Sequence, residues 1–170
     1  MNTSLGISLA DSFRIVDMGR LLFGVEAAGK PHLLSLLAAR SARLTGLKPH
    51  RVFEAMSTGV HFTSDRVAGG VVVVSAALPE FGGVVWTAAR LMTPAPYGAQ
   101  DGVPVDLAFA VIGNPRSVTA RRAAQSFARL SRDQEALAYL RSATSISWFR
   151  AELTWALERL DYREPAKMTG

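Results

Sequence analysis

The 170-residue sequence contains no cysteine, which excludes disulfide bonds, thiol chemistry and any metal site built on cysteine. Long apolar runs are absent as well, because charged residues interrupt every hydrophobic stretch before it reaches the roughly 18 residues of a membrane-spanning helix. The first residues, MNTSLGISLADSF, lack the basic segment and apolar run of a signal peptide. We therefore expect a soluble, cytoplasmic protein without membrane insertion.

Specialised nucleic-acid motifs are also missing: there is no zinc finger, no aromatic RNA-binding motif and no sustained run of lysine and arginine. The formal net charge is only +5, although five arginines fall between Arg116 and Arg132. A basic helix face of this kind can bind phosphate or nucleic acid. It is more often a solvated surface, so nucleic-acid binding is the least favoured of our functional hypotheses.

The sequence has enough hydrophobic residues to form one core. Hydrophobic residues make up 49% of the chain, and its length suits a single domain, 1–170, with a short N-terminal leader and a frayed tail at 163–170. The stretch AGGVVVVSAAL, residues 68–78, contains four consecutive valines and no polar alternation. This pattern predicts a central strand buried on both faces. Its hydroxyl residue, Ser75, is a candidate functional side chain at the sheet edge.

Strand and helix signals alternate along the rest of the chain. Further strands are predicted at 20–26, 84–92 and 103–112, and Pro94 and Pro96 should end the second of these. Helices should begin at the proline-containing positions near 31 and 49, and only helices should follow residue 115. The stretch 57–65 should be a loop. The sequence thus predicts an α/β domain, a single sheet with helices on its faces.

The segment RLMTPAPYGAQDGVPVDLAFAVI, 90–112, resembles the enzyme IIA domain of the bacterial phosphotransferase system, of the fructose/mannitol type (type 2) and its nitrogen-regulatory branch. That family has a closely similar Asp-Gly-x-Pro-Val-Asp-Leu motif before a long strand. The strand VVVVSA at 71–76 matches its "IAIPHA" strand without a gap, and FARLSRD at 127–133 resembles its "ARLLRD" helix. The resemblance, from about residue 15 to 157, implies a mixed sheet with helices on both faces.

The chain differs from the resembling family at the positions that take part in phosphoryl transfer. In the resembling proteins, the histidine of "IAIPHA" receives a phosphoryl group from a small carrier protein. Ser75 holds that place here, Val74 replaces the preceding proline, and a second family histidine falls on or close to Ala120. The family's glycine-rich loop is also rewritten, with Thr63 and Arg66 among the replacements.

These replacements change what the position can do. An imidazole nitrogen is a good nucleophile near neutral pH and forms a labile phosphoramidate, whereas a serine hydroxyl without a paired base is a poor nucleophile and its phosphoester is too stable for relay. Ser75 either fills space at a strand end or keeps a residual regulatory role. His61 is the one histidine placed to substitute as phosphoacceptor, although a solvated loop histidine is the simpler interpretation.

Other candidate residues have ordinary structural explanations. His32 and His50 adjoin helix-starting prolines and should be surface residues, and three dispersed histidines make a poor metal site. Asp101 is followed by a glycine and should form a turn, and Asp106 should tie down a nearby loop. We do not expect the two aspartates to form a catalytic acid pair. We expect no metal and no cofactor.

The leading hypothesis is a degenerate, non-phosphorylatable relative of nitrogen-regulatory enzyme IIA, a pseudo-enzyme that acts as a regulatory protein-binding module. The alternative is an active phosphocarrier that uses His61. The partner of the regulatory module would be a protein such as a phosphotransferase-system carrier, a kinase or a transporter, or a second copy of the chain. The predicted interaction surface surrounds the vacated phosphoacceptor position and comprises Phe62, Thr63, Arg66, Val74, Ser75 and Phe81.

Overall fold

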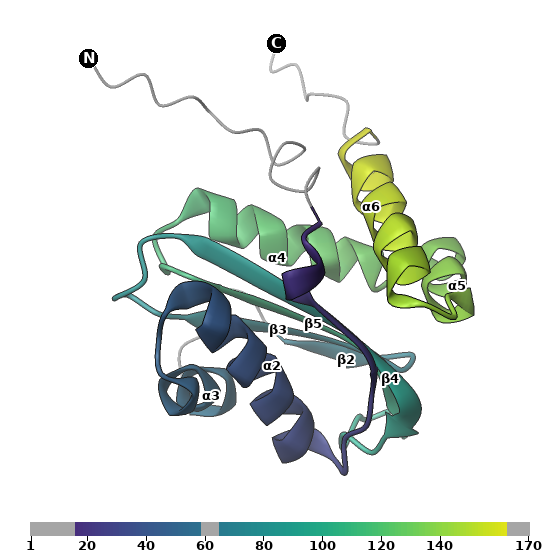
Figure 1. The fold of residues 1–170 in the computed structure, drawn as a ribbon, viewed down its shortest axis with the longest axis horizontal. Helices are drawn as coiled ribbons and strands as arrows, with labels where there is room; N and C mark the ends of the chain where they lie inside the picture. Colours follow the sequence, from purple (N-terminus) through teal and green to yellow (C-terminus); the bar gives the residue numbers. More distant parts are fainter. Residues whose placement is uncertain (1–15, 59–64, 163–170) are drawn as a thin grey trace.

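The computed structural model describes residues 16–58 and 65–162, and its centre is one mixed five-stranded sheet (Figure 1). The strand order is β1-β4-β5-β3-β2, in which β1 runs parallel to β4 and β3 runs parallel to β5, while the other pairs are antiparallel. The strands are β1 (Leu21–Val25), β2 (Arg66–Ala68), β3 (Val71–Ala77), β4 (Val84–Ala95) and β5 (Val105–Gly113). This architecture confirms the predicted α/β fold with a mixed sheet.

Helices cover both faces of the sheet. In Figure 1, α2 and α3 lie below it, and α4, α5 and α6 lie above it. Their bounds, with the short 3-10 turn η1, are η1 (Met18–Arg20), α2 (Lys30–Thr45), α3 (Pro49–Thr58), α4 (Val118–Leu130), α5 (Gln134–Ser142) and α6 (Ile146–Tyr162). Within the described ranges, no helix is long and apolar enough to cross a membrane.

Side chains of strand β3 contribute to a separate core on each face of the sheet, as expected for a strand buried on both sides. Val71 and Val73 pack with Phe109, Phe127 and the apolar side of α6. Val72, Val74 and Ala76 pack instead with the buried side chains of α2 and α3. All seven residues of β3 are buried, which confirms its predicted central place in the sheet.

Two sequence predictions about the strands are wrong. The residues before Gly69 form the short strand β2, which pairs antiparallel with Val71–Val73 through a two-residue turn. Both glycines of that turn, Gly69 and Gly70, have positive φ angles of 61° and 78°, a hairpin conformation that glycine adopts without strain. The other error concerns β4, which continues to Ala95. Its register with β5 shifts after Arg90, so Pro94 lies where regular pairing is already interrupted.

The motif that carries the resemblance builds a polar cluster beside this turn. Arg141 of α5 donates to both oxygens of Asp106, with Nε 2.9 Å from Oδ2 and Nη2 2.9 Å from Oδ1, and also donates to the Gly69 carbonyl. Asp101 accepts the backbone N–H groups of Gly69 and Val103. The prediction that Asp106 ties down a nearby loop is therefore confirmed, and the two aspartates serve the turn rather than a shared catalytic site.

Candidate functional site

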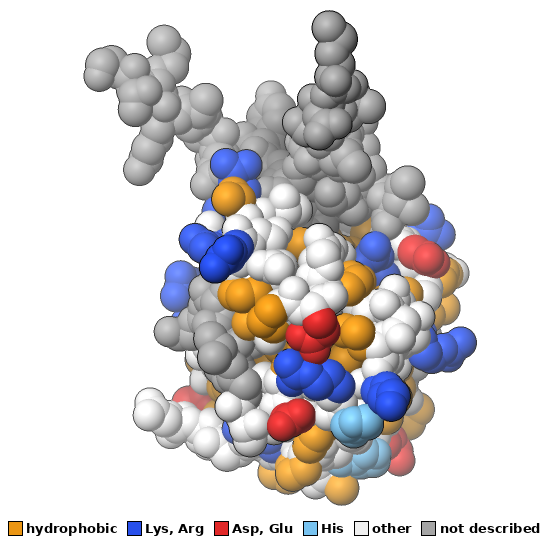
Figure 2. All heavy atoms as spheres, turned by 90° about the vertical axis from the view of Figure 1, so that its left-hand side faces the viewer, with side chains coloured by type: hydrophobic (Ala, Val, Ile, Leu, Met, Phe, Trp, Pro, Cys, Tyr) orange, Lys and Arg blue, Asp and Glu red, His pale blue; other side chains and the backbone are white. Residues whose placement is uncertain are grey.

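The candidate site lies toward the end of β3 that is opposite to the glycine turn. The β3–β4 connection there falls at the left of Figure 1, and Figure 2 shows that side of the molecule. Hydrophobic side chains gather near the centre of this view, and Lys and Arg side chains lie around them. Ser75, which the sequence resemblance places at the phosphoacceptor position, belongs to this part of the sheet.

Ser75 does not present its side chain at the sheet edge, contrary to the sequence-based expectation. The strand continues for two residues beyond it, to Ala77, and Ser75 is only 1% exposed. Val73 and Val111 adjoin Ser75 on its own strand and on β5, and both belong to the core beneath α4. A residue enclosed in this way cannot meet a docking protein without movement of its surroundings.

The backbone of Ser75 has a partner that sequence reasoning missed. Its N–H donates to Oδ1 of Asp65 at 3.1 Å. Asp65 immediately precedes β2, whose pairing with β3 reaches Val73. The carboxylate therefore takes the place of a ladder acceptor for the N–H two residues beyond the last paired residue, Val73. An aspartate directly before a strand was the only sequence signal available for this contact.

The predicted interaction surface is divided between the two faces of the sheet. Arg66 is paired with Val73, so its side chain lies on the same face as Val73 and Ser75. Val74 points to the opposite face, where it is 1% exposed, and the partly buried Phe81 packs against that second core. Val74 thus offers a partner no surface. Arg66 and Phe81 are the predicted members that remain partly accessible.

The Nε atom of the Arg66 side chain is buried, and it has no hydrogen-bond partner among the described residues. Phe62 and Thr63, the remaining predicted members of the interaction surface, and His61, the alternative phosphoacceptor, lie outside the described residues. His32 and His50 are exposed, as predicted, and Nδ1 of His32 accepts the Ala28 N–H at 3.0 Å. The described part of the chain contains no group of three side chains suited to hold a metal ion.

The position expected near the second family histidine is closely packed. Ala120 lies in the first turn of α4, where Ser117 caps the helix by accepting the Ala120 N–H. The side chain of Ala120 is fully buried, and a methyl group built on Gly113 would stand 2.9 Å from its Cβ. There is no space for an imidazole at this point without rearrangement.

Comparison with known proteins supports the resemblance seen in the sequence. No family model matches the chain. A nitrogen regulatory protein of Bradyrhizobium diazoefficiens is 32% identical over 125 residues, which are 72% of this chain and 81% of that protein. Among solved structures, nitrogen regulatory protein IIA-Ntr from Neisseria meningitidis is 18% identical, with a TM-score of 0.68, over 84% of this chain and 98% of its own.

A second solved structure has a similar fold. IIA mannitol from Escherichia coli is 14% identical, with a TM-score of 0.63, over 82% of this chain and 99% of its own. At such low identity, these two structures establish a shared fold. The similarity to the Bradyrhizobium protein carries the family relationship.

Proposed function

Because this chain belongs to the nitrogen-regulatory enzyme IIA family of the phosphotransferase system, we propose that it is a degenerate member that regulates a partner by binding it and does not relay phosphate. The regulatory members of the family act by docking onto other proteins, with phosphorylation as the switch. The observation that carries the proposal is the burial of Ser75, the serine that the sequence resemblance places at the position of the phosphoacceptor histidine.

Two features support the loss of relay. A relay residue must accept phosphate from one protein and release it to another, so it must be accessible and form a labile bond. Ser75 is 1% exposed, and a serine phosphoester is not labile. Ala120, at or near the second histidine position, has no group that could exchange protons or stabilise a phosphoryl group.

Phosphorylation by the complete upstream system tests this proposal. The full chain is incubated with phosphoenolpyruvate, the system's first enzyme and its carrier protein, beside a histidine-containing enzyme IIA of the same branch. We expect phosphate on the control protein and none on this chain. Acid-labile phosphate that disappears in His61→Ala would establish the phosphocarrier alternative. Acid-stable phosphate that disappears in Ser75→Ala would equally contradict the proposal.

We propose that the partner is a protein, with a carrier, a kinase or a transporter of this system as candidates, and that Arg66 and Phe81 contribute to its binding. The partial exposure of both side chains supports this, because a partner can reach them without rearrangement of the core. With the carrier protein as the first probe, Arg66→Glu and Phe81→Ala should each weaken binding. Arg122→Glu, an exposed change on α4, is the matched control.

A further inference from the structure

A second surface, separate from the Ser75 region, gathers exposed aromatic side chains on α5 and α6. Tyr139, Trp148 and Trp155 are 45%, 43% and 39% exposed, although large aromatic side chains are usually more deeply buried. The opposite side of α6 packs into the core, since Phe149 and Leu153 are completely buried. The outer side of α6 is therefore a candidate interaction surface.

The exposed indoles are held in place by neighbouring groups. Trp155 meets Tyr139 edge-on, with ring centroids 5.4 Å apart, and the guanidinium of Arg159 lies 4.9 Å from its ring centre. Arg159 is itself fixed by Glu135, whose Oε2 accepts a hydrogen bond of 2.7 Å. Trp148 donates from Nε1 to Glu152 at 3.0 Å. Aromatic side chains fixed in advance lose little entropy on binding, which is a property of binding hot spots.

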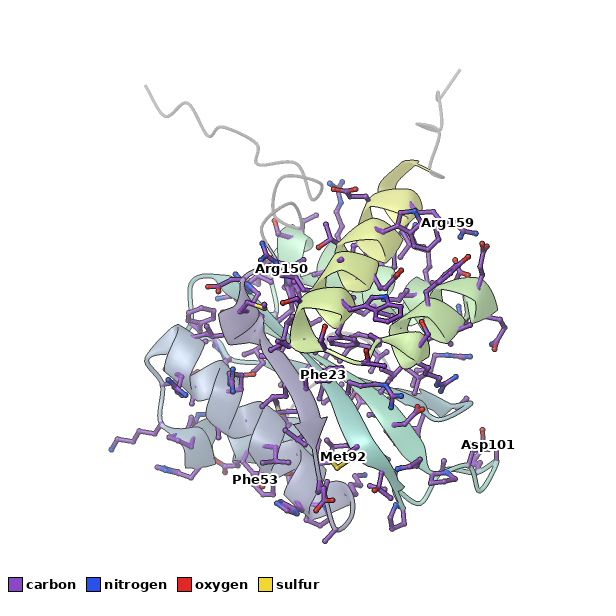
Figure 3. The ribbon with its side chains drawn as sticks, turned by 45° about the vertical axis from the view of Figure 1, so that its right-hand side comes forward. Phe23, Phe53, Met92, Asp101, Arg150 and Arg159 are labelled. Carbon is purple, nitrogen blue, oxygen red and sulfur yellow. The ribbon has the colours of Figure 1, made fainter. Side chains whose placement is uncertain are left out.

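Beside Trp155 the surface is hollowed. The hollow has a volume of about 420 Å³ and is lined by Ser147, Arg150, Ala151, Thr154, Trp155 and Glu158. Ser147, Ala151 and Thr154 are small, so a second helix can approach the backbone of α6 closely along this line. Arg150 and Arg159 point to different sides of the helix (Figure 3), and of the two only Arg150 lines the hollow.

The charges on the rim of the hollow are complementary to a second copy of the same helix. Arg150 and Glu158 lie eight residues, about two turns, apart on one side of α6, and neither forms an ion pair with another described residue. In an antiparallel helix pair with two-fold symmetry, positions equally distant from the axis meet each other. An axis at Thr154 therefore places Arg150 beside the partner's Glu158, and the reverse pair forms at the same time.

We propose that the chain forms a symmetric dimer through antiparallel packing of α6 against α6 of a second copy. Trp155 is one residue from the axis, so the two indoles meet at the centre of the interface. The helix is 17 residues long, or about 25 Å, and contact along one such helix buries less than a standard interface. The dimer should accordingly be weak, with a dissociation constant on the order of 10–100 μM.

Sedimentation of the full chain over that concentration range, combined with charge reversal, tests the dimer. Arg150→Glu and Glu158→Arg should each weaken association about tenfold, because like charges then face each other in both symmetric pairs. The double variant Arg150→Glu/Glu158→Arg should restore it. Arg122→Glu, which reverses an exposed charge on α4, should leave association unchanged.

Tryptophan fluorescence gives an independent measurement. Trp86 is 4% exposed and contributes a constant signal, whereas the emission of the two exposed tryptophans on α6, Trp148 and Trp155, should shift to shorter wavelength as the dimer forms. A chain that stays monomeric at every concentration would overturn the proposal, as would a dimer that is insensitive to the single reversals or is not restored by the double variant. The dimer does not depend on Ser75, so its failure leaves the proposed regulatory function untouched.

Discussion

Gly113 at the end of β5 lies directly against Ala120 in the first turn of α4, so closely that a methyl group added to Gly113 would be 2.9 Å from the Ala120 Cβ and 3.1 Å from the Gly83 carbonyl. The close approach joins the end of the central sheet to the start of the helix that covers it. It also leaves no room for a larger side chain at the point where a second histidine was expected.

Gly113→Ala should therefore lower the free energy of unfolding by about 1–3 kcal/mol, the usual cost of overpacking. The contact alone causes this, since Gly113 does not have a positive φ angle. The same change made in an Ala120→Gly background should cost less, because the opposing methyl group is gone. Denaturant unfolding of the two single variants and the double variant measures this coupling, and equal costs in both backgrounds would contradict it.

Ala120→His should not recreate a family-like second histidine. Ala120 is fully buried, so an imidazole there must displace its neighbours, and we expect a loss of about 2–3 kcal/mol in the free energy of unfolding. Thermal and urea unfolding provide the measurement. Thr119→His, on the exposed side of the same helical turn, is the control and should be nearly neutral.

Asp65→Ala should remove the acceptor for the Ser75 N–H, with a loss of about 1–2 kcal/mol in the free energy of unfolding. Amide hydrogen exchange reports the contact directly, since the Ser75 amide should exchange faster while the Val73 amide, which lies within the paired part of β3, serves as the reference. Asp65→Asn keeps an acceptor oxygen and should protect Ser75 better than alanine does. Unchanged exchange in Asp65→Ala would show that another group holds this N–H.

Gly70→Ala should be more damaging than Gly69→Ala. Both positions have positive φ angles, so both changes strain the backbone, but only at Gly70 would the new methyl group approach Nη2 of Arg141, at 2.9 Å. At Gly69 nothing lies within 4 Å. We expect about 1 kcal/mol for Gly69→Ala and clearly more for Gly70→Ala, measured by denaturant unfolding. Equal losses would show that Arg141 moves aside without cost.

The stability of the glycine turn should depend on pH through Asp101. Hydrogen bonds from the Gly69 and Val103 N–H groups lower the pKa of Asp101 below its ordinary value. A carboxylate whose pKa is depressed by folding stabilises the folded state above its unfolded pKa, about 3.9, and this contribution is lost as the pH falls through the folded pKa. The stability difference between wild type and Asp101→Asn should therefore shrink between neutral pH and pH about 3, as urea unfolding at each pH would show.

The main strands and the helices could be predicted because their signals are local. Four consecutive valines identify β3, and Asp133 caps α5 by accepting the Ala136 N–H. β2 has only three residues, too few for a periodic pattern. The continuation of β4 through Pro94 depends on the interrupted register with β5, which the sequence of β4 alone does not contain.

The site was harder to predict than the fold because burial is a property of the whole packed molecule. The sequence resemblance places Ser75 at the phosphoacceptor position, but the enclosure of Ser75 depends on strands and a helix that come from separate parts of the chain. The same holds for the division of Arg66 and Val74 between opposite faces, which follows from the register with β3. No sequence motif predicted the aromatic surface on α6, because its residues are spaced along the helix among buried ones.

The contact between Arg141 and the carbonyl of Gly69 joins positions 72 residues apart. During synthesis, the residues of the β2–β3 hairpin are made before α5, and until α5 is made Asp106 has, among the described residues, only Arg90 of β4, at 3.9 Å, as a cationic partner, and the glycine turn lacks its contact with Arg141. A nascent chain that has reached only α4 thus holds the central strands without the contact that secures one end of them. A contact of such long sequence separation can form only after α5 has been synthesised.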